Sequence, residues 1–149
     1  MQASIDAVRV AATHDGPAPV VLLGLEGESD VVPIFVGAEE ALAIARGMDA
    51  EDIGRPLTHD LLLDVMEELG GRVEKIVVSA VEEKTYIGDL HLETPRGETV
   101  VDARPSDCLA LAARTNASIE VARSVFESGR SDPEEFAAFD DVRDVTEYP

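Results

Sequence analysis

The sequence contains one cysteine, no tryptophan and only two lysines, and these scarcities exclude several kinds of protein. A single thiol, Cys108, forms neither an internal disulfide nor a zinc cluster built on several thiolates. No apolar run approaches the ~18 residues that a membrane span requires, so we expect no membrane partner. The first residues lack a basic region followed by an apolar one, so we expect no signal peptide and a cytoplasmic protein.

Acidic residues dominate the composition, since 31 Asp and Glu residues oppose 12 Lys and Arg residues and give a net charge of −19. Such an acidic surface is typical of halophilic proteins. At ~1 M salt the Debye length is about 3 Å, so the ions screen the repulsion between the carboxylates of the chain. The alternative interpretation is a surface that repels nucleic acid and marks a basic partner. In both cases a broad basic patch is excluded, so any contact with nucleic acid must be local.

The chain is most simply one domain in which short strands alternate with short helices. Apolar alternation and turn residues predict strands at 4–13, 19–25, 31–36, 72–82, 84–94, 98–103 and 119–121. Helical periodicity predicts helices at 38–48, from 58 to the glycines at 70–71, at 105–115 and briefly at 122–128. We expect an α+β fold with mixed sheets and helices packed on one side. The domain is assigned to 1–130, and 131–149 is an acidic tail. In this tail Phe136 and Phe139 are spaced to dock a helical turn on the body, and the alternative is a frayed end.

The second predicted helix begins at Thr58, which is the expected N-cap residue. Its apolar positions recur at helical spacing and predict one buried face, formed by Leu61, Leu62, Val65, Met66 and Leu69.

Two segments of the chain align without gaps, Val32–Ala45 and Thr99–Ala112. In each, a predicted strand runs directly into a helix rich in Ala and Leu, and Glu40 and Asp107 occupy the same helical place. The alignment predicts a duplicated unit of three strands and a helix. Chance similarity between two amphipathic helices is the alternative.

A polar stretch stands at the start of the third predicted helix, and it contains Asp102, Arg104, Ser106 and Asp107. Helix entrances present free N–H groups and a positive dipole end, which favour anions such as phosphate. Arg104 could hold a phosphate with two hydrogen bonds, while Asp102 and Asp107 could bind a divalent ion or act as general base. The structural alternative is an acid that favours the helix dipole by ~0.3–1 kcal/mol and an Arg104–Asp102 ion pair.

A similar polar stretch precedes the second helix and contains Arg55, Thr58, His59 and Asp60. An imidazole at a helix entrance is a candidate neutral base or metal ligand, and Arg55 could supply a cation to a substrate. Capping by Thr58 and an acid in the first turn explain Thr58 and Asp60 without any ligand. Weaker candidates, with ordinary structural explanations, are Glu40, His91, His14 and Cys108.

Three ordered motifs in this sequence resemble the bifunctional nuclease family: Pro33–Ala41 (Pro-Ile-Phe-Val-Gly-Ala-Glu-Glu-Ala), Arg55–Leu61 (Arg-Pro-Leu-Thr-His-Asp-Leu) and Val101–Leu111 (Val-Asp-Ala-Arg-Pro-Ser-Asp-Cys-Leu-Ala-Leu). The resemblance spans about residues 30–128. It implies an α+β domain that self-associates and, for plant relatives, cleavage of both DNA and RNA. By motif, it favours Glu40, His59, Asp60, Asp102, Arg104, Ser106 and Asp107 as site residues.

The leading hypothesis is therefore a nuclease that cleaves DNA, RNA or both with little sequence preference. In it, Mg²⁺ or Mn²⁺ held by Glu40, Asp102 and Asp107 polarises the phosphate and activates water. Catalysis would further involve His59, Asp60, Arg104 and Ser106, and substrate binding would involve Arg55, Thr58 and Arg104. We expect a homo-oligomer, most simply a dimer. The alternatives are a non-catalytic oligomeric module that binds a small anionic ligand or a partner protein, and a purely structural role for the motifs.

Overall fold

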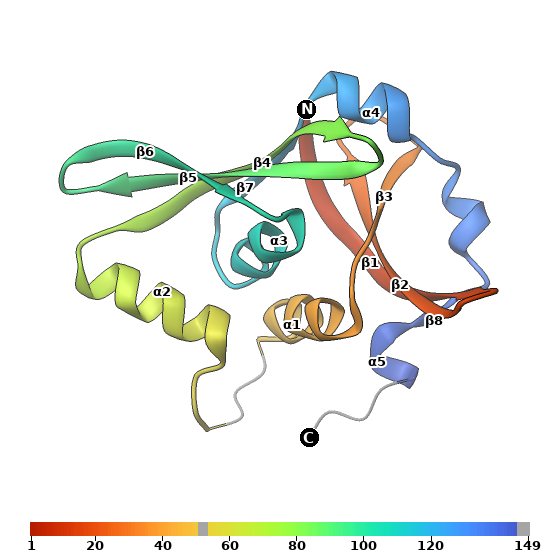
Figure 1. Ribbon diagram of the computed structural model, residues 1–149, viewed down its shortest axis with the longest axis horizontal. Helices are drawn as coiled ribbons and strands as arrows, with labels where there is room; N and C mark the ends of the chain where they lie inside the picture. Colours follow the sequence, from red (N-terminus) through yellow and green to blue (C-terminus); the bar gives the residue numbers. More distant parts are fainter. Residues whose placement is uncertain (51–53, 146–149) are drawn as a thin grey trace.

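One mixed sheet of eight strands organises the computed structural model, which describes residues 1–50 and 54–145 (Figure 1). The strands are β1 (Gln2–Thr13), β2 (Gly16–Leu25), β3 (Val31–Phe35), β4 (Arg72–Glu82), β5 (Thr85–Thr94), β6 (Gly97–Ala103), β7 (Ser118–Val121) and β8 (Asp140–Asp141). The helices are α1 (Ala38–Met48), α2 (Thr58–Glu68), α3 (Pro105–Ala113), α4 (Arg123–Gly129), the 3-10 helix η1 (Pro133–Phe136) and α5 (Val142–Val145). The predicted α+β fold is confirmed.

Each half of the sheet is an antiparallel run of three strands followed by a helix. The first half is β1, β2, β3 and α1, and the second is β4, β5, β6 and α3. The sheet order is β3-β2-β1-β7-β4-β5-β6, so β7 lies in the middle, antiparallel to β1 and parallel to β4. The predicted unit of three strands and a helix therefore occurs twice. The strand β3, which contains Pro33, lies at an edge of the sheet, where proline is tolerated.

The main core lies between the sheet and helices α1 and α3, which pack against each other below it (Figure 1). Alternate strand residues point into this core, and Leu23, Ile44, Ile76 and Leu109 are completely buried there. Because α1 and α3 each follow directly from the last strand of their half, this packing brings the two helix N-termini together.

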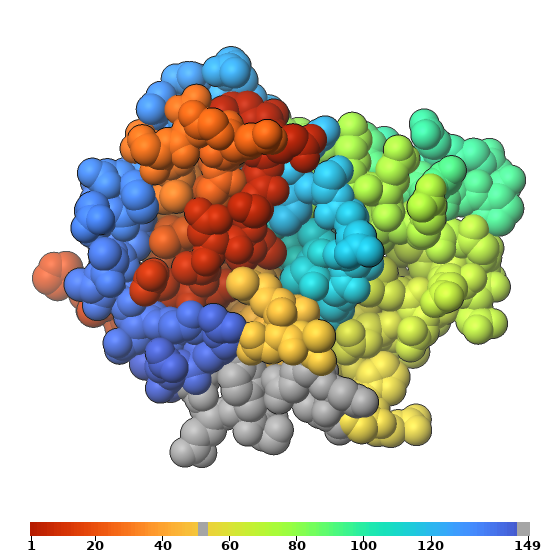
Figure 2. Space-filling model, turned by 180° about the vertical axis from the view of Figure 1, so that it is seen from behind, coloured from red at the N-terminus to blue at the C-terminus, as the bar shows by residue number. Residues whose placement is uncertain are grey.

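The C-terminal segment lies against the strands of the first half, as Figure 2 shows in blue on red and orange. Phe136 is buried with Val20 and Leu22 on the face of the sheet opposite to the main core. Val142 is buried as well, and β8 pairs with β1. The described part of the predicted tail is thus docked on the body through Phe136, as its spacing suggested.

The predicted buried face of α2 is wrong. Within this helix no described residue is fully buried, and Leu61, Leu62, Val65 and Leu69 are each between 45% and 74% exposed. Of the five predicted side chains, Met66 is the one that packs on the core, together with Leu63. The apolar stripe continues around the helix beyond the part that its neighbours cover, so periodicity alone could not place the buried edge.

The predicted N-cap of α2 also requires correction. Leu57 occupies the N-cap position in extended conformation, and Thr58 is the first helical residue. The backbone N–H of Leu57 donates to Asp60 Oδ2 at 3.1 Å. An acid in the first turn therefore binds the free N–H group at the helix start, and the Thr58 hydroxyl is not needed for this.

Among the described residues, no helix is both long and apolar enough to cross a membrane.

Candidate functional site

Residues from the starts of α1, α2 and α3 line one pocket of about 400 Å³. Each of these helices carries an acid at its third position: Glu40 in α1, Asp60 in α2 and Asp107 in α3. The residues that line the pocket are Glu39, Glu40, Ala43, Arg46, Leu57, Thr58, His59, Arg104, Asp107 and Arg114. The two polar stretches predicted from the sequence therefore meet in space.

Asp107 is the centre of a hydrogen-bonded network in this pocket. Its Oδ1 lies 3.0 Å from His59 Nε2, although the two residues are 48 positions apart in the sequence. Arg104 donates from Nε to Asp107 Oδ2 at 3.1 Å and from Nη2 to Oδ1 at 3.3 Å. The same guanidinium donates through Nη1 to Glu40 Oε1 at 3.3 Å. One arginine thus joins carboxylates from equivalent positions of the two halves.

The charges in the network are fixed by mutual stabilisation. Partial burial raises the pKa of the Asp107 carboxyl, but hydrogen bonds from Arg104 and His59 outweigh it, and the pKa lies below the usual aspartate value. The pKa of Arg104 is raised, chiefly by its hydrogen bond to Asp107. Asp107 is therefore a carboxylate near neutral pH and accepts the Nε2–H of His59, which leaves Nδ1 as the proton acceptor of the ring.

Glycine at position 37 leaves room for this network. In the internal alignment Gly37 stands where the second half has Arg104, so only one half supplies a guanidinium. A Cβ atom at Gly37 would collide with the Glu40 carboxylate, which folds back over this glycine. The absence of a side chain therefore lets Glu40 take up the position from which it binds Arg104.

Arg114 holds the three helices together and was missed by the sequence analysis. It is 7% exposed, donates from Nε to Asp60 Oδ1 of α2, and donates from Nη1 to the carbonyls of Ala43 in α1 and Ala110 in α3, each at 2.8 Å. Asp60 is the neighbour of His59, so this half-buried ion pair fixes the backbone from which the imidazole extends. The spacing could have indicated it, since Arg114 follows Asp107 by two helical turns on the same face.

Five predicted site residues do not join the Asp107 network: Arg55, Thr58, Asp60, Asp102 and Ser106. Asp60 is bound to Arg114 and to the Leu57 N–H, which is a structural role. Asp102 lies on the far face of the sheet, because Val101 pairs with the buried Leu90 and Asp102 points the other way. Arg55 is exposed and does not line the pocket.

The other predicted residues, including Thr58 and Ser106, lie at or beside the pocket. Glu40, Thr58, His59, Arg104 and Asp107 all line it. Ser106 is buried in the first turn of α3 and lines an adjoining pocket instead.

The family model described as "Bifunctional nuclease domain" matches residues 20–134, which is well over half of the chain. The chain belongs to the bifunctional nuclease domain family. Two uncharacterized proteins from strains of Mycobacterium tuberculosis are each 36% identical over 107 residues, covering 72% of this chain and 63% of the relative. A protein named Bifunctional nuclease 2 from Oryza sativa subsp. japonica is 25% identical over 116 residues, covering 75% of this chain and 36% of that protein. The chain thus spans less than two thirds of the length of these relatives.

The carboxylates of this bifunctional nuclease domain do not fit the predicted metal site. Across residues 1–50 and 54–145, no group of three or more His, Cys, Asp and Glu side chains is arranged to hold a metal ion. Of the predicted ligands, Glu40 and Asp107 face the pocket, but the Arg104 guanidinium bridges them, and Asp102 lies on the other face of the sheet. The predicted set of Glu40, Asp102 and Asp107 is therefore not assembled.

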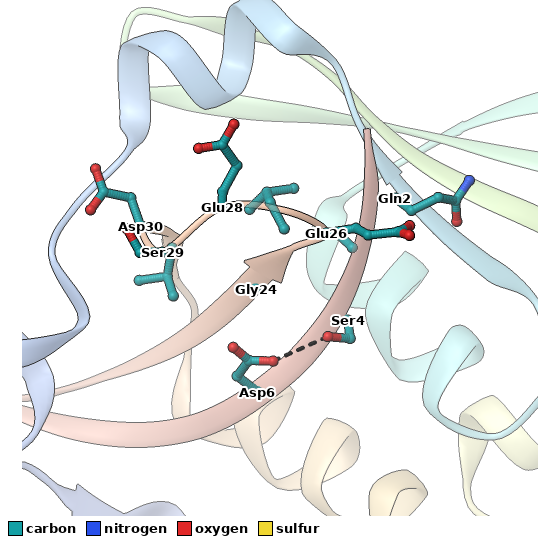
Figure 3. A pocket seen from close by; sticks show the side chains of 11 residues that line it. Gln2, Ser4, Asp6, Gly24, Glu26, Glu28, Ser29 and Asp30 are labelled. Carbon is teal, nitrogen blue, oxygen red and sulfur yellow. Dashed lines mark hydrogen bonds between the residues drawn. The ribbon is translucent and has the colours of Figure 1, made fainter.

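A hollow of about 410 Å³ elsewhere on the domain is lined by carboxylates (Figure 3). It lies between β1 and the loop that joins β2 to β3, and it contains Asp6, Glu26, Glu28 and Asp30. Asp6 accepts a hydrogen bond from Ser4, and Asp30 pairs with Arg130. Because its lining is acidic, this hollow repels a phosphate and is not a candidate site for one.

Proposed function

We propose that this chain is a nuclease that hydrolyses the phosphodiester bonds of DNA, RNA or both. One observation carries the proposal: an imidazole, a carboxylate and a guanidinium, joined by hydrogen bonds, line a single pocket. This combination offers a general base and a cation for a phosphate. Membership of the bifunctional nuclease domain family supports the same assignment.

In the proposed reaction Asp107 orients His59 by accepting its Nε2–H. Nδ1 of His59 takes a proton from a water molecule as the water oxygen bonds to phosphorus and the P–O ester bond breaks. The departing ester oxygen takes a proton from solvent, and the His59 imidazolium then releases its extra proton to solvent. Arg104 stabilises the charge that develops on the phosphoryl oxygens. Its side chain is 64% exposed, and three of its five N–H groups serve Asp107 and Glu40, so two donors are left for the substrate.

Three arginines and three acids line the pocket, so its formal charge is balanced in a chain whose net charge is −19. Three of its ten arginines, Arg46, Arg104 and Arg114, line the pocket. A site that contacts phosphate through imidazole and guanidinium groups reads no base edges, so cleavage has little sequence preference. Binding then depends on a few local contacts and weakens as salt rises.

The test is cleavage of labelled single-stranded DNA and RNA by the wild-type chain and by His59→Asn and Asp107→Asn variants. Loss of a general base costs about 10²–10⁴ in rate, so both variants should be at least about 100-fold slower. The control is His91→Asn, purified identically, because His91 lies on β5 and does not line the pocket. Equal rates in all four proteins identify a contaminating nuclease and refute the proposal.

The reaction is derived without a metal ion, because no group of three or more His, Cys, Asp and Glu side chains in residues 1–50 and 54–145 is arranged to hold one. Activity should therefore survive exhaustive treatment with a chelator. A rate that disappears with chelator and returns with Mg²⁺ or Mn²⁺ contradicts this part of the proposal, and it would require Arg104 to leave Glu40 and Asp107.

A second candidate function is binding of a small anionic ligand without turnover. The observation that favours it is the engagement of Arg104 by two carboxylates, which resembles a stable anchor more than an open catalytic group. Stabilisation of the chain by nucleotides or phosphate in thermal unfolding, with no cleavage under any condition, distinguishes this function from catalysis.

The proposal includes self-association as a dimer through the edge strand β6. Val100 and Val101 are exposed on opposite faces of β6, and one side of this strand is open. A second β6 paired in antiparallel orientation about the Val100–Val101 midpoint places Val100 opposite Val101 and Glu98 opposite Ala103, so acids do not face each other. The exposed side chains of α2 add apolar surface in the same half.

Light scattering after size exclusion tests this dimer. The wild-type chain should have twice its mass of 15.9 kDa, and Val101→Lys should have the monomer mass. Val145→Lys changes an exposed valine on α5, away from β6, and should leave the dimer intact. A monomeric wild-type chain refutes the proposed association.

A further inference from the structure

A second pocket adjoins the proposed catalytic pocket. Glu40 and Arg104 line both, so the two pockets lie on either side of the same ion pair. The second pocket has a volume of about 380 Å³ and is formed by the end of β3, the turn between β4 and β5, and the start of α3. A substrate held at Arg104 and longer than one phosphodiester unit can therefore extend into it.

Residue types that are scarce in this chain meet in the second pocket. The sequence has six aromatic residues and two lysines among 149 residues, and Phe35, Tyr86 and Lys84 all line this pocket. Phe35 is 58% exposed, whereas the other phenylalanines that the structure describes are buried or partly buried. The pocket thus combines two aromatic rings with the cations Lys84 and Arg104 in a chain of net charge −19.

The local backbone holds these side chains in place. Phe35 is the last residue of β3, and alternation along the strand turns it outward while Ile34 is buried. Lys84 lies in the tight turn between β4 and β5, where Glu83 and Lys84 adopt φ values of 48° and 67°. Two successive positive φ values are typical of the two-residue hairpin turn that matches the strand twist. This turn fixes the backbone of Lys84 two residues before Tyr86.

We propose that this second pocket binds the unpaired nucleotide next to the scissile phosphate of a single-stranded nucleic acid. This inference rests on the proposed function and names its substrate class. The base stacks on Phe35 and Tyr86, an interaction that every base can make because each has a flat π face. Lys84 contacts the next phosphate and offsets part of the repulsion from the acidic surface. A paired base in a duplex cannot enter in this way.

The experiment measures binding of a labelled phosphorothioate oligonucleotide, single-stranded or as a duplex, by fluorescence anisotropy at several KCl concentrations. Phe35→Leu removes the ring, and Lys84→Asn removes the charge with a residue that tolerates positive φ. Each has a matched control outside the pocket: Val145→Ala for an exposed apolar side chain, and Arg96→Asn for an exposed cation at the opposite end of β5. Unchanged melting temperatures verify that the variants fold.

We expect Phe35→Leu to weaken single-strand binding about tenfold and duplex binding far less. Lys84→Asn should weaken binding of the single strand and reduce the slope of log affinity against log salt by about 1. Wild-type affinity in both variants overturns the inference, as does equal weakening by the controls or equal loss on the duplex. Failure of the proposed function gives a different result: the wild-type chain cleaves no nucleic acid, while single-strand affinity still depends on Phe35 and Lys84.

Discussion

Replacing Arg114 by methionine tests whether one buried side chain holds α1, α2 and α3 around the pocket. Methionine keeps most of the apolar stem but removes three hydrogen bonds of 2.8 Å, to Asp60 Oδ1 and to the carbonyls of Ala43 and Ala110. Arg114 itself is 7% exposed, whereas its partner Asp60 is 39% exposed.

The expected loss of stability follows from these contacts. Hydrogen bonds to a charged group contribute ~1.5–3 kcal/mol each, and removing one partner of a buried ion pair costs ~3–5 kcal/mol. Asp60 is partly exposed and regains water, which places the result at the lower end of that range. We therefore expect Arg114→Met to lower the free energy of unfolding by about 3 kcal/mol, a large part of the stability of a domain of this size.

The assay is urea-induced unfolding of both chains in the same concentration of KCl. Arg123→Met is the control, because Arg123 is exposed and forms a long i,i+4 pair with Glu127 at 3.8 Å. Such surface pairs contribute at most ~1 kcal/mol. A loss below about 1 kcal/mol in Arg114→Met, equal to that of the control, would refute the role of Arg114 as the anchor of the three helices.

Three further predictions concern the charges and the thiol. The pKa of Asp107 is lower in the folded chain than in the unfolded one, so its contribution to stability is present above about pH 4 and is lost as the pH falls through the folded pKa. In this acidic range the melting temperature of Asp107→Asn should therefore change less with pH than that of the wild-type chain. Equal slopes of melting temperature against pH in the two chains would contradict this. Burial, followed by nearby acids, raises the pKa of Cys108 to about 12, so a thiol reagent at pH 8 should label the native chain far more slowly than the unfolded chain. The net charge of −19 predicts that the melting temperature rises between about 0.1 and 2 M KCl, and an unchanged value would argue against a halophilic protein.

The positions of the strands and helices could be predicted from local sequence, because glycine, proline and polar clusters mark the ends of these elements. The predicted helix at 38–48 has the same bounds as α1, and the strands predicted at 72–82 and 84–94 agree within one residue with β4 and β5. These boundaries depend on neighbouring residues alone. The internal alignment of Val32–Ala45 with Thr99–Ala112 also anticipated that the two halves have the same order of elements.

Tertiary contacts decided the parts that the sequence did not predict. The apolar stripe of α2 is real, but its width exceeds the surface that the core offers, so Leu62 and Leu69 are exposed while Leu63 and Met66 pack inward. Asp102 is predicted as a site residue because it belongs to the polar stretch at the start of the third helix. The register of β6 against β5 sends it to the other face, and register is set by pairing between distant segments.

The site follows from the duplicated frame together with one difference between its halves. Equivalent strand-to-helix junctions place Glu40 and Asp107 near each other, and two carboxylates in one pocket repel unless a cation separates them. The chain has glycine at this junction in the first half and arginine in the second, so a single guanidinium serves both acids. A second arginine in place of Gly37 would collide with the Glu40 side chain. His59 hydrogen-bonds to Asp107, the acid of the second half. One guanidinium and one imidazole therefore make the nearly symmetric frame asymmetric, and these are the two groups that the proposed nuclease reaction uses.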